Sequence, residues 1–115
     1  MSYVNNYQCC GNLTSEPVLS EHGGQPYTKF VVALNKPGQK KPSYVDCIVW
    51  GDLSLRIVDH CTKGTEVFLS GEIETSNYVD SRGSYHKSTS LRVEKFSITK
   101  RGRGEAEVSL PKPLV

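Results

Sequence analysis

The stretch with the clearest chemical potential is residues 44–51, which read Tyr-Val-Asp-Cys-Ile-Val-Trp-Gly. Its β-branched and aromatic residues predict a strand, in which successive side chains point to opposite faces. Alternate residues from 45 to 49 then form an apolar face, whereas Tyr44, Asp46 and Trp50 share the other face. Two flat rings on a mixed polar face can stack on unpaired nucleobases, because every base has a π-face. The alternative is that both rings cover a core.

The elements that must position these rings follow from the spacing of apolar residues and from the turn residues. The four-residue spacing of Leu53, Ile57 and Cys61 predicts one short helix over 52–62. Alternating patterns predict strands at 3–13, 27–34, 44–51, 65–78 and 85–99. We therefore predict an all-β fold: a five-stranded Greek-key barrel of the OB-fold class, with the helix between strands 3 and 4.

Two glycines and one break in alternation predict where the strands bend. Gly11 and Gly71 lie inside predicted strands, where glycine marks a bend or a close approach of another backbone. The apolar residues occupy odd positions at 91 and 93 but even positions at 96 and 98, which predicts a β-bulge between them.

Length and composition restrict the class of protein. The 115 residues suffice for one domain, and no apolar run approaches the ~20 residues that cross a bilayer. The N-terminus lacks the basic and hydrophobic regions of a secretion signal, which predicts a cytoplasmic protein with no membrane partner. The four cysteines have no Cys-x-x-Cys spacing and no histidine at ligand spacing, so we expect reduced thiols, no metal and no cofactor.

Charge is distributed unevenly along the chain. Residues 1–99 contain ten Lys and Arg against ten Asp and Glu, so the predicted domain is neutral. The surplus lies in 100–115, which we predict to be a flexible basic tail. A neutral domain is a weak indication of nucleic-acid binding, and its loop lysines are also explained by solvation alone. The candidate phosphate contacts are Lys36, Lys40, Lys41, Arg82, Lys87, Lys100, Arg101 and Arg103.

The sequence offers little support for an enzyme. Glu72 and Glu74 share a strand face, but paired carboxylates are common on protein surfaces. The three histidines are scattered over a turn, the helix and a strand, and no phosphate loop or nucleophile elbow is present. We predict a non-catalytic protein.

Three segments resemble the bacterial-type single-stranded DNA-binding proteins, and the resemblance covers residues 7–98. They are Cys-Gly-Asn-Leu at 10–13 with Glu-Pro at 16–17, the stretch 44–53, and Lys-Gly-Thr-Glu-Val-Phe-Leu-Ser-Gly at 63–71. By position, the resemblance implies that Trp50, Tyr44 and Tyr78 stack on DNA bases.

The chain departs from the family pattern in three places. The loop near 36–38 lacks the family's aromatic residue, and Asp46 stands where the family often has a basic residue. Both departures imply weaker binding. The basic tail also replaces the acidic tip through which the family recruits other enzymes, so replication proteins are not expected to bind in that way. A short phage- or plasmid-type member, a relative of primosomal replication protein B, or a chain truncated at its C-terminus would each have this form.

The resemblance implies largely sequence-independent binding of single-stranded DNA in replication, recombination or repair, by a nucleoid-associated homo-oligomer, with a tetramer favoured over a dimer. Single-stranded RNA is a variant ligand, because stacking does not distinguish the sugars. The alternative is an OB-fold interaction or assembly subunit of a primosome-like complex, with aromatics in an interface and weak affinity for nucleic acid.

Overall fold

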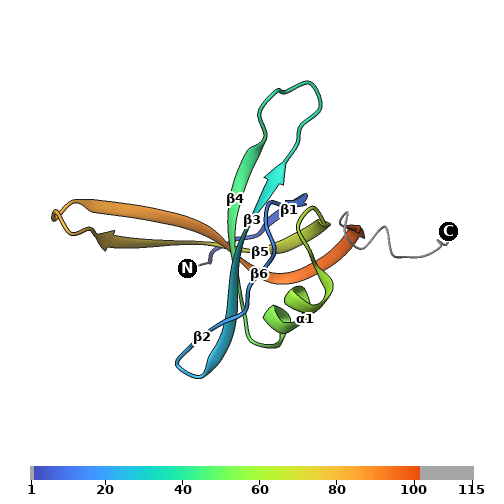
Figure 1. The fold of residues 1–115 in the computed structure, drawn as a ribbon. Helices are drawn as coiled ribbons and strands as arrows, with labels where there is room; N and C mark the ends of the chain where they lie inside the picture. Colours follow the sequence, from blue (N-terminus) through green and yellow to red (C-terminus); the bar gives the residue numbers. More distant parts are fainter. Residues whose placement is uncertain (1, 102–115) are drawn as a thin grey trace.

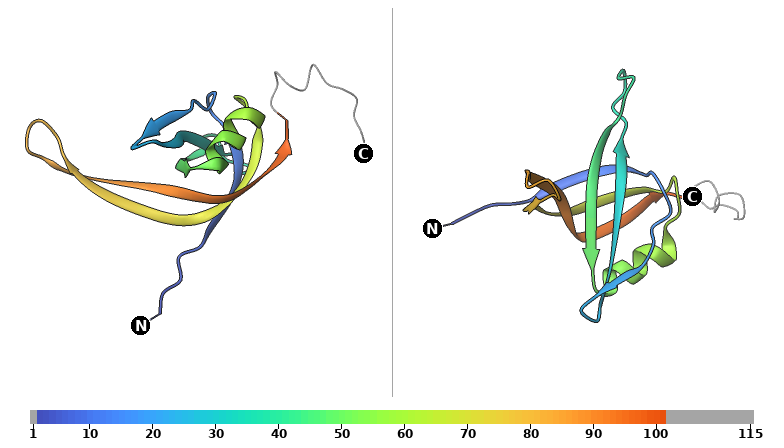
Figure 2. Two further views of the ribbon diagram at one scale, coloured as in Figure 1. Left: turned by 90° about the horizontal axis from the view of Figure 1, so that it is seen from below. Right: turned by 60° about the vertical axis from the view of Figure 1, so that its left-hand side comes forward.

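Residues 2–101 are described by the computed structural model, and they form six strands and one helix (Figure 1). In chain order the elements are β1 (Tyr7–Leu13), β2 (Ser20–His22), β3 (Gln25–Leu34), β4 (Ser43–Trp50), α1 (Asp52–His60), β5 (Glu66–Val79) and β6 (Tyr85–Lys100). The six strands form one barrel and the hairpin arms that extend from it, and α1 packs against β3 and β4 (Figures 1 and 2).

The barrel closes because β1 pairs with two partners. The strand order is β1-β5-β6-β4-β3-β2, and β1 also pairs with β3. β1 is antiparallel to β5 from Tyr7 to Asn12, and then pairs with β3 at Asn12 and Leu13. β6 meets β4 in a short parallel contact at Cys47 and Ile48. The predicted barrel, with its helix between the third and fourth predicted strands, is confirmed.

One strand was missing from the prediction. β2 forms a tight hairpin with β3 through Gly23 and Gly24, whose φ angles are 61° and 81°. Two consecutive positive φ angles fit the turn that matches the twist of paired strands. The sequence of β2, Ser-Glu-His, is fully exposed and has no apolar alternation. Only its pairing with Gln25–Leu34 defines it as a strand, so the sheet has six strands rather than five.

Side-chain alternation places the core as expected. Cys47 and Val49 of β4 are buried together with Val67 and Leu69 of β5. Ile57 of α1 is 1% exposed, and α1 packs against β3 and β4. The helix ends at His60, two residues earlier than predicted, because Cys61 adopts an extended conformation while its N–H donates to the Ile57 carbonyl at 2.9 Å.

All four cysteines are free, as predicted. Cys9, Cys47 and Cys61 are buried, and Cys10 is exposed. Burial raises the pKa of the Cys9 and Cys47 thiols above the ordinary value, which keeps both protonated and unreactive.

Two arms extend from the barrel. β5 and β6 remain paired as far as Val79 and Tyr85, well beyond the last core residue of β5 (Figure 2). β3 and β4 form the second arm, which ends in the loop 35–42 (Figure 1). Together with the shorter β2–β3 hairpin, these arms project from the barrel in different directions (Figure 1).

The predicted bends occur at Gly11 and Gly71. A Cβ on Gly11 would lie 2.5 Å from the carbonyl oxygen of Ala33, so the closure of the barrel requires glycine there. A Cβ on Gly71 would collide with the carbonyl oxygen of Arg92. The β5–β6 register shifts between Ser70 and Gly71, and Glu94 is left without a partner. This shift is the predicted bulge between residues 93 and 96.

Gly71→Ala should therefore destabilise the protein by about 2 kcal/mol, because the added methyl group meets backbone that cannot rotate away. The free energy of unfolding is measured by urea denaturation. Ser70→Ala, one residue earlier on the outward face, is the matched control and should change stability little. Equal denaturation midpoints for the two variants would contradict the close approach.

Candidate nucleic-acid interface

An open groove of about 850 Å³ lies between the outer face of β3–β4 and the base of the β5–β6 arm. The groove follows from strand alternation, because the residues of β4 that point away from the core line its floor. Its lining includes Ser15, Lys29, Val31, Asp46, Ile48, Trp50, Glu74, Ser76, Ser88 and Ser90.

Trp50 lines one end of this groove in a pair of rings. It is half-buried, and its β3 partner in the register is Tyr27. The two ring centroids are 4.9 Å apart with 32° between the planes, and His22 meets the indole edge-on at 6.4 Å. Trp50 therefore does not belong to the core, which takes the neighbouring Val49. A supported ring at the end of an open groove is suited to stacking.

Sequence reasoning missed Tyr27. It lies two residues before Lys29 in the predicted strand 27–34, so alternation alone places the two side chains on the same face of the strand. Its contact with Trp50 depends on the β3–β4 register, which alternation does not give.

Tyr44 lies at the other end of β4 and is 63% exposed. By alternation it shares the Trp50 face of the strand, but it is not part of the groove lining. Its β3 partner is Ala33, so no ring supports it from the opposite strand.

Tyr78 lies on the β5–β6 arm, away from the barrel, and is 53% exposed. It is two residues beyond Ser76, which lines the groove, and so shares its strand face. Its ring stacks on His86, with centroids 5.0 Å apart and 18° between the planes. The three predicted stacking residues are thus distributed over the groove and two arms rather than gathered in one cluster.

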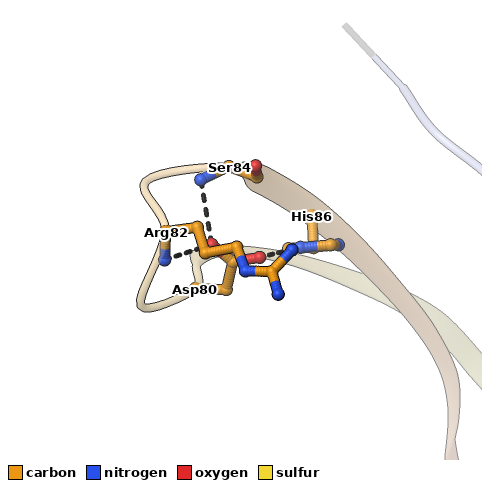
Figure 3. Close-up of polar contacts among 4 residues, drawn as sticks. All are labelled: Asp80, Arg82, Ser84 and His86. Carbon is orange, nitrogen blue, oxygen red and sulfur yellow. Dashed lines mark hydrogen bonds and ion pairs between the residues drawn. The ribbon is translucent and has the colours of Figure 1, made fainter.

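The tip of the arm is held by Asp80 (Figure 3). Its Oδ1 atom accepts the backbone N–H groups of Arg82 and Ser84, each at 2.9 Å. Its Oδ2 atom is 2.8 Å from Nε2 of His86. The bond to His86, followed by the backbone bonds, lowers the pKa of Asp80 below its ordinary value.

None of the predicted phosphate contacts within residues 2–101 lines the groove; they lie on exposed loops and along β6. Lys36, Lys40 and Lys41 are exposed in the loop of the β3–β4 arm, and Arg82 is exposed at the other tip. Lys100 ends β6 and Arg101 follows it, both exposed. Lys87 pairs with Asn77 and alternates to the opposite face of the arm from Tyr78. Arg103 lies outside the described residues.

The charges inside the groove are mixed. Lys29, which sequence reasoning did not select, lines the groove opposite Ile48 in the register. Glu74 is 3.9 Å from Arg92, whereas Asp46 forms no ion pair within residues 2–101. Asp46 therefore makes the floor unfavourable for a phosphate and favours an arrangement in which an anionic chain keeps its phosphates at the rim.

Comparison with known proteins places the chain in a family. The profile of the single-strand binding protein family matches residues 4–99, and the chain therefore belongs to this family. This membership supports the prediction of a non-catalytic protein. Within residues 2–101, no three His, Cys, Asp or Glu side chains are arranged to hold a metal ion. No helix in the same range is long and apolar enough to cross a membrane.

Among its relatives, the single-stranded DNA-binding protein of Lactiplantibacillus plantarum is 28% identical over 110 residues, which cover 90% of this chain and 54% of that protein. The chain thus spans about half the length of that relative. The protein of the same name from Clostridium perfringens is 29% identical, over 90% of this chain and 71% of its own.

The fold is shared with a mitochondrial single-stranded DNA binding protein of S. cerevisiae, known from a crystal structure. Its TM-score is 0.73 at 18% identity, and the match covers 89% of this chain and 100% of that one. At this level of identity the likeness concerns the fold.

Proposed function

We propose that this chain binds single-stranded DNA in a largely sequence-independent way, as a non-catalytic protein of replication, recombination or repair that is associated with the nucleoid. The observation that carries the proposal is the Tyr27–Trp50 ring pair at one end of an open groove. Bases stack on Trp50, on Tyr44 at the far end of β4 and on Tyr78 along the arm. Single-stranded RNA is a variant ligand, because stacking is indifferent to the sugar.

In this arrangement the bases face the floor of the groove and the phosphates face its rim. The distribution of charge supports this orientation, because Asp46 lies on the floor while Lys36, Lys40, Lys41 and Arg82 lie on the exposed hairpin loops. Cations on these loops contribute contacts that do not depend on sequence. Asp46, which forms no ion pair within residues 2–101, lowers affinity relative to a basic residue at the same place.

Trp50→Ala should weaken binding to oligo-dT by about 1–3 kcal/mol, the usual loss for one stacked base, while the fold is retained. Affinity is measured by anisotropy of a labelled oligonucleotide and stability by thermal unfolding. Trp50→Phe, which keeps a ring, is the control and should lose less. In the native protein Trp50 is the only tryptophan, so oligo-dT should quench its fluorescence. Lower thermal stability with unchanged affinity would assign the indole a purely structural role.

We further propose that the protein is a homo-oligomer, with a tetramer favoured over a dimer. β1 pairs with β3 only at Asn12 and Leu13, so within the described residues its outer edge from Tyr7 to Gly11 has no strand partner. An open edge of this kind favours pairing with a second copy.

Light scattering at micromolar concentration should therefore give a mass several times the 12.8 kDa of one chain. A monomer mass that persists as the protein is concentrated would contradict self-association. It would also favour the second candidate function, an assembly subunit whose exposed rings and edge are covered by another protein. The carboxylate of Asp46 in the groove is the observation that favours this second candidate.

We propose that the basic residues at and beyond the end of β6, Lys100, Arg101 and Arg103, add phosphate contacts, Arg103 lying outside the described residues. Each phosphate neutralised on a single strand adds about 0.7 to the slope of log affinity against log salt. Replacing Lys100, Arg101 and Arg103 together with Gln should therefore reduce that slope by roughly 2. Quenching of Trp50 at saturation should not change. Identical slopes for the two proteins would show that the tail does not contact DNA.

A further inference from the structure

Side chains at the tip of the β5–β6 arm contact one another, although the tip lies far from the core. The last strand pairs, Tyr78 with His86 and Val79 with Tyr85, are followed by a five-residue turn. The arm has left the barrel at this point, so no core packing fixes its side chains (Figure 2). Any fixed geometry here must come from contacts within the tip.

The first such contact is the ring pair. Tyr78 and His86 are direct partners across the two strands, and their planes are within 18° of parallel. Ser76 and Ser88, the next pair inward on the same face, line the groove. The ring pair therefore extends the groove-facing side of the arm outward.

The second contact fixes the histidine. The Oδ1 atom of Asp80 is held by the backbone N–H groups of Arg82 and Ser84, which leaves Oδ2 directed at His86 (Figure 3). A carboxylate only accepts hydrogen bonds, so Nε2 of His86 carries the proton in this bond. The imidazole is thus held at its edge by Asp80 and on one face by Tyr78.

The lowered pKa of Asp80 means that this carboxylate stays ionised, and keeps accepting, down to acidic pH. Arg82 is the other charged group of the turn, and its side chain extends past Asp80 toward His86 (Figure 3). Lys87 alternates to the opposite face.

We propose that Tyr78 and His86 act as one two-ring unit that stacks on a base of single-stranded DNA, and that Asp80 is the positioning residue of this unit. The proposal rests on the proposed function, which already includes Tyr78, and adds His86 and Asp80 to it. A ring pair that is already held in place loses little side-chain freedom when a base stacks on it, and this preorganisation favours binding.

Asp80→Ser separates this role from simple electrostatics. The serine keeps an acceptor for the turn but is too short to reach His86, and it removes one negative charge. Charge alone predicts unchanged or tighter binding to DNA, because one repulsion is lost. The proposal predicts binding to oligo-dT weaker by about threefold or more. Asp59→Ser, which removes an exposed acid from α1, is the matched control and should not weaken binding.

His86→Ala should weaken binding by about fivefold or more, whereas His60→Ala, at the end of α1, should not. Asp80→Ser should add no further loss in the His86→Ala background, because a residue that acts through another has no effect once that partner is gone. The slope of log affinity against log salt should be the same in all of these variants, because stacking releases no counterions.

The proposal would be overturned if His86→Ala bound oligo-dT with unchanged affinity. It would also be overturned if Asp80→Ser bound as tightly as Asp59→Ser. A loss of affinity that comes entirely from a smaller salt slope would overturn it as well. Quenching of Trp50 by oligo-dT distinguishes these outcomes from failure of the proposed function. If quenching persists in the tip variants, the groove binds DNA whatever the tip does; if the native protein shows none, the proposed function itself has failed.

Discussion

The structure depends on one feature of the backbone, the change of partner by which β1 leaves β5 and joins β3. Leu13 donates to the Thr65 carbonyl and accepts from the Gly64 N–H, both at 2.9 Å, so the end of β1 is tied to the start of β5. The change is possible because Gly11 lets the Ala33 carbonyl approach its Cα. Closure turns one face of each strand into the core and leaves the outer face of β3–β4 exposed as a groove floor.

Two features with opposite chemical preferences determine which ligands the groove can bind. The Tyr27–Trp50 pair offers apolar ring surface, whereas the carboxylate of Asp46 opposes phosphate on the same floor. A ligand that presents flat apolar groups inward and negative charge outward satisfies both features, and an unpaired nucleic-acid strand has this form. The neutral charge of residues 1–99 fits binding in which stacking matters more than charge.

The β5–β6 arm presents further ring surface outside the barrel. Its strands stay paired without a core beneath them, and its tip is held by two backbone hydrogen bonds within residues 80–84 and by the hydrogen bonds of the Asp80 carboxylate. Local hydrogen bonds replace burial as the source of order there. The arm can thus present the Tyr78–His86 rings at a distance from the barrel.

The sequence by itself determined the elements and their faces. The alternation of residues 44–50 assigned Val49 to the core and Trp50 to the opposite face, and the break in alternation before Phe96 located the bulge. Whether the Trp50 ring covered a core or lined a groove was decided only by the structure. These features are local, because a period of two fixes which face a side chain takes. Tertiary structure alone decided which residues meet. Tyr27 reaches Trp50, and Asp80 reaches His86, through strand registers and a turn geometry that no local pattern contains. β2 exists for the same reason, because three exposed residues become a strand only when β3 supplies the hydrogen bonds.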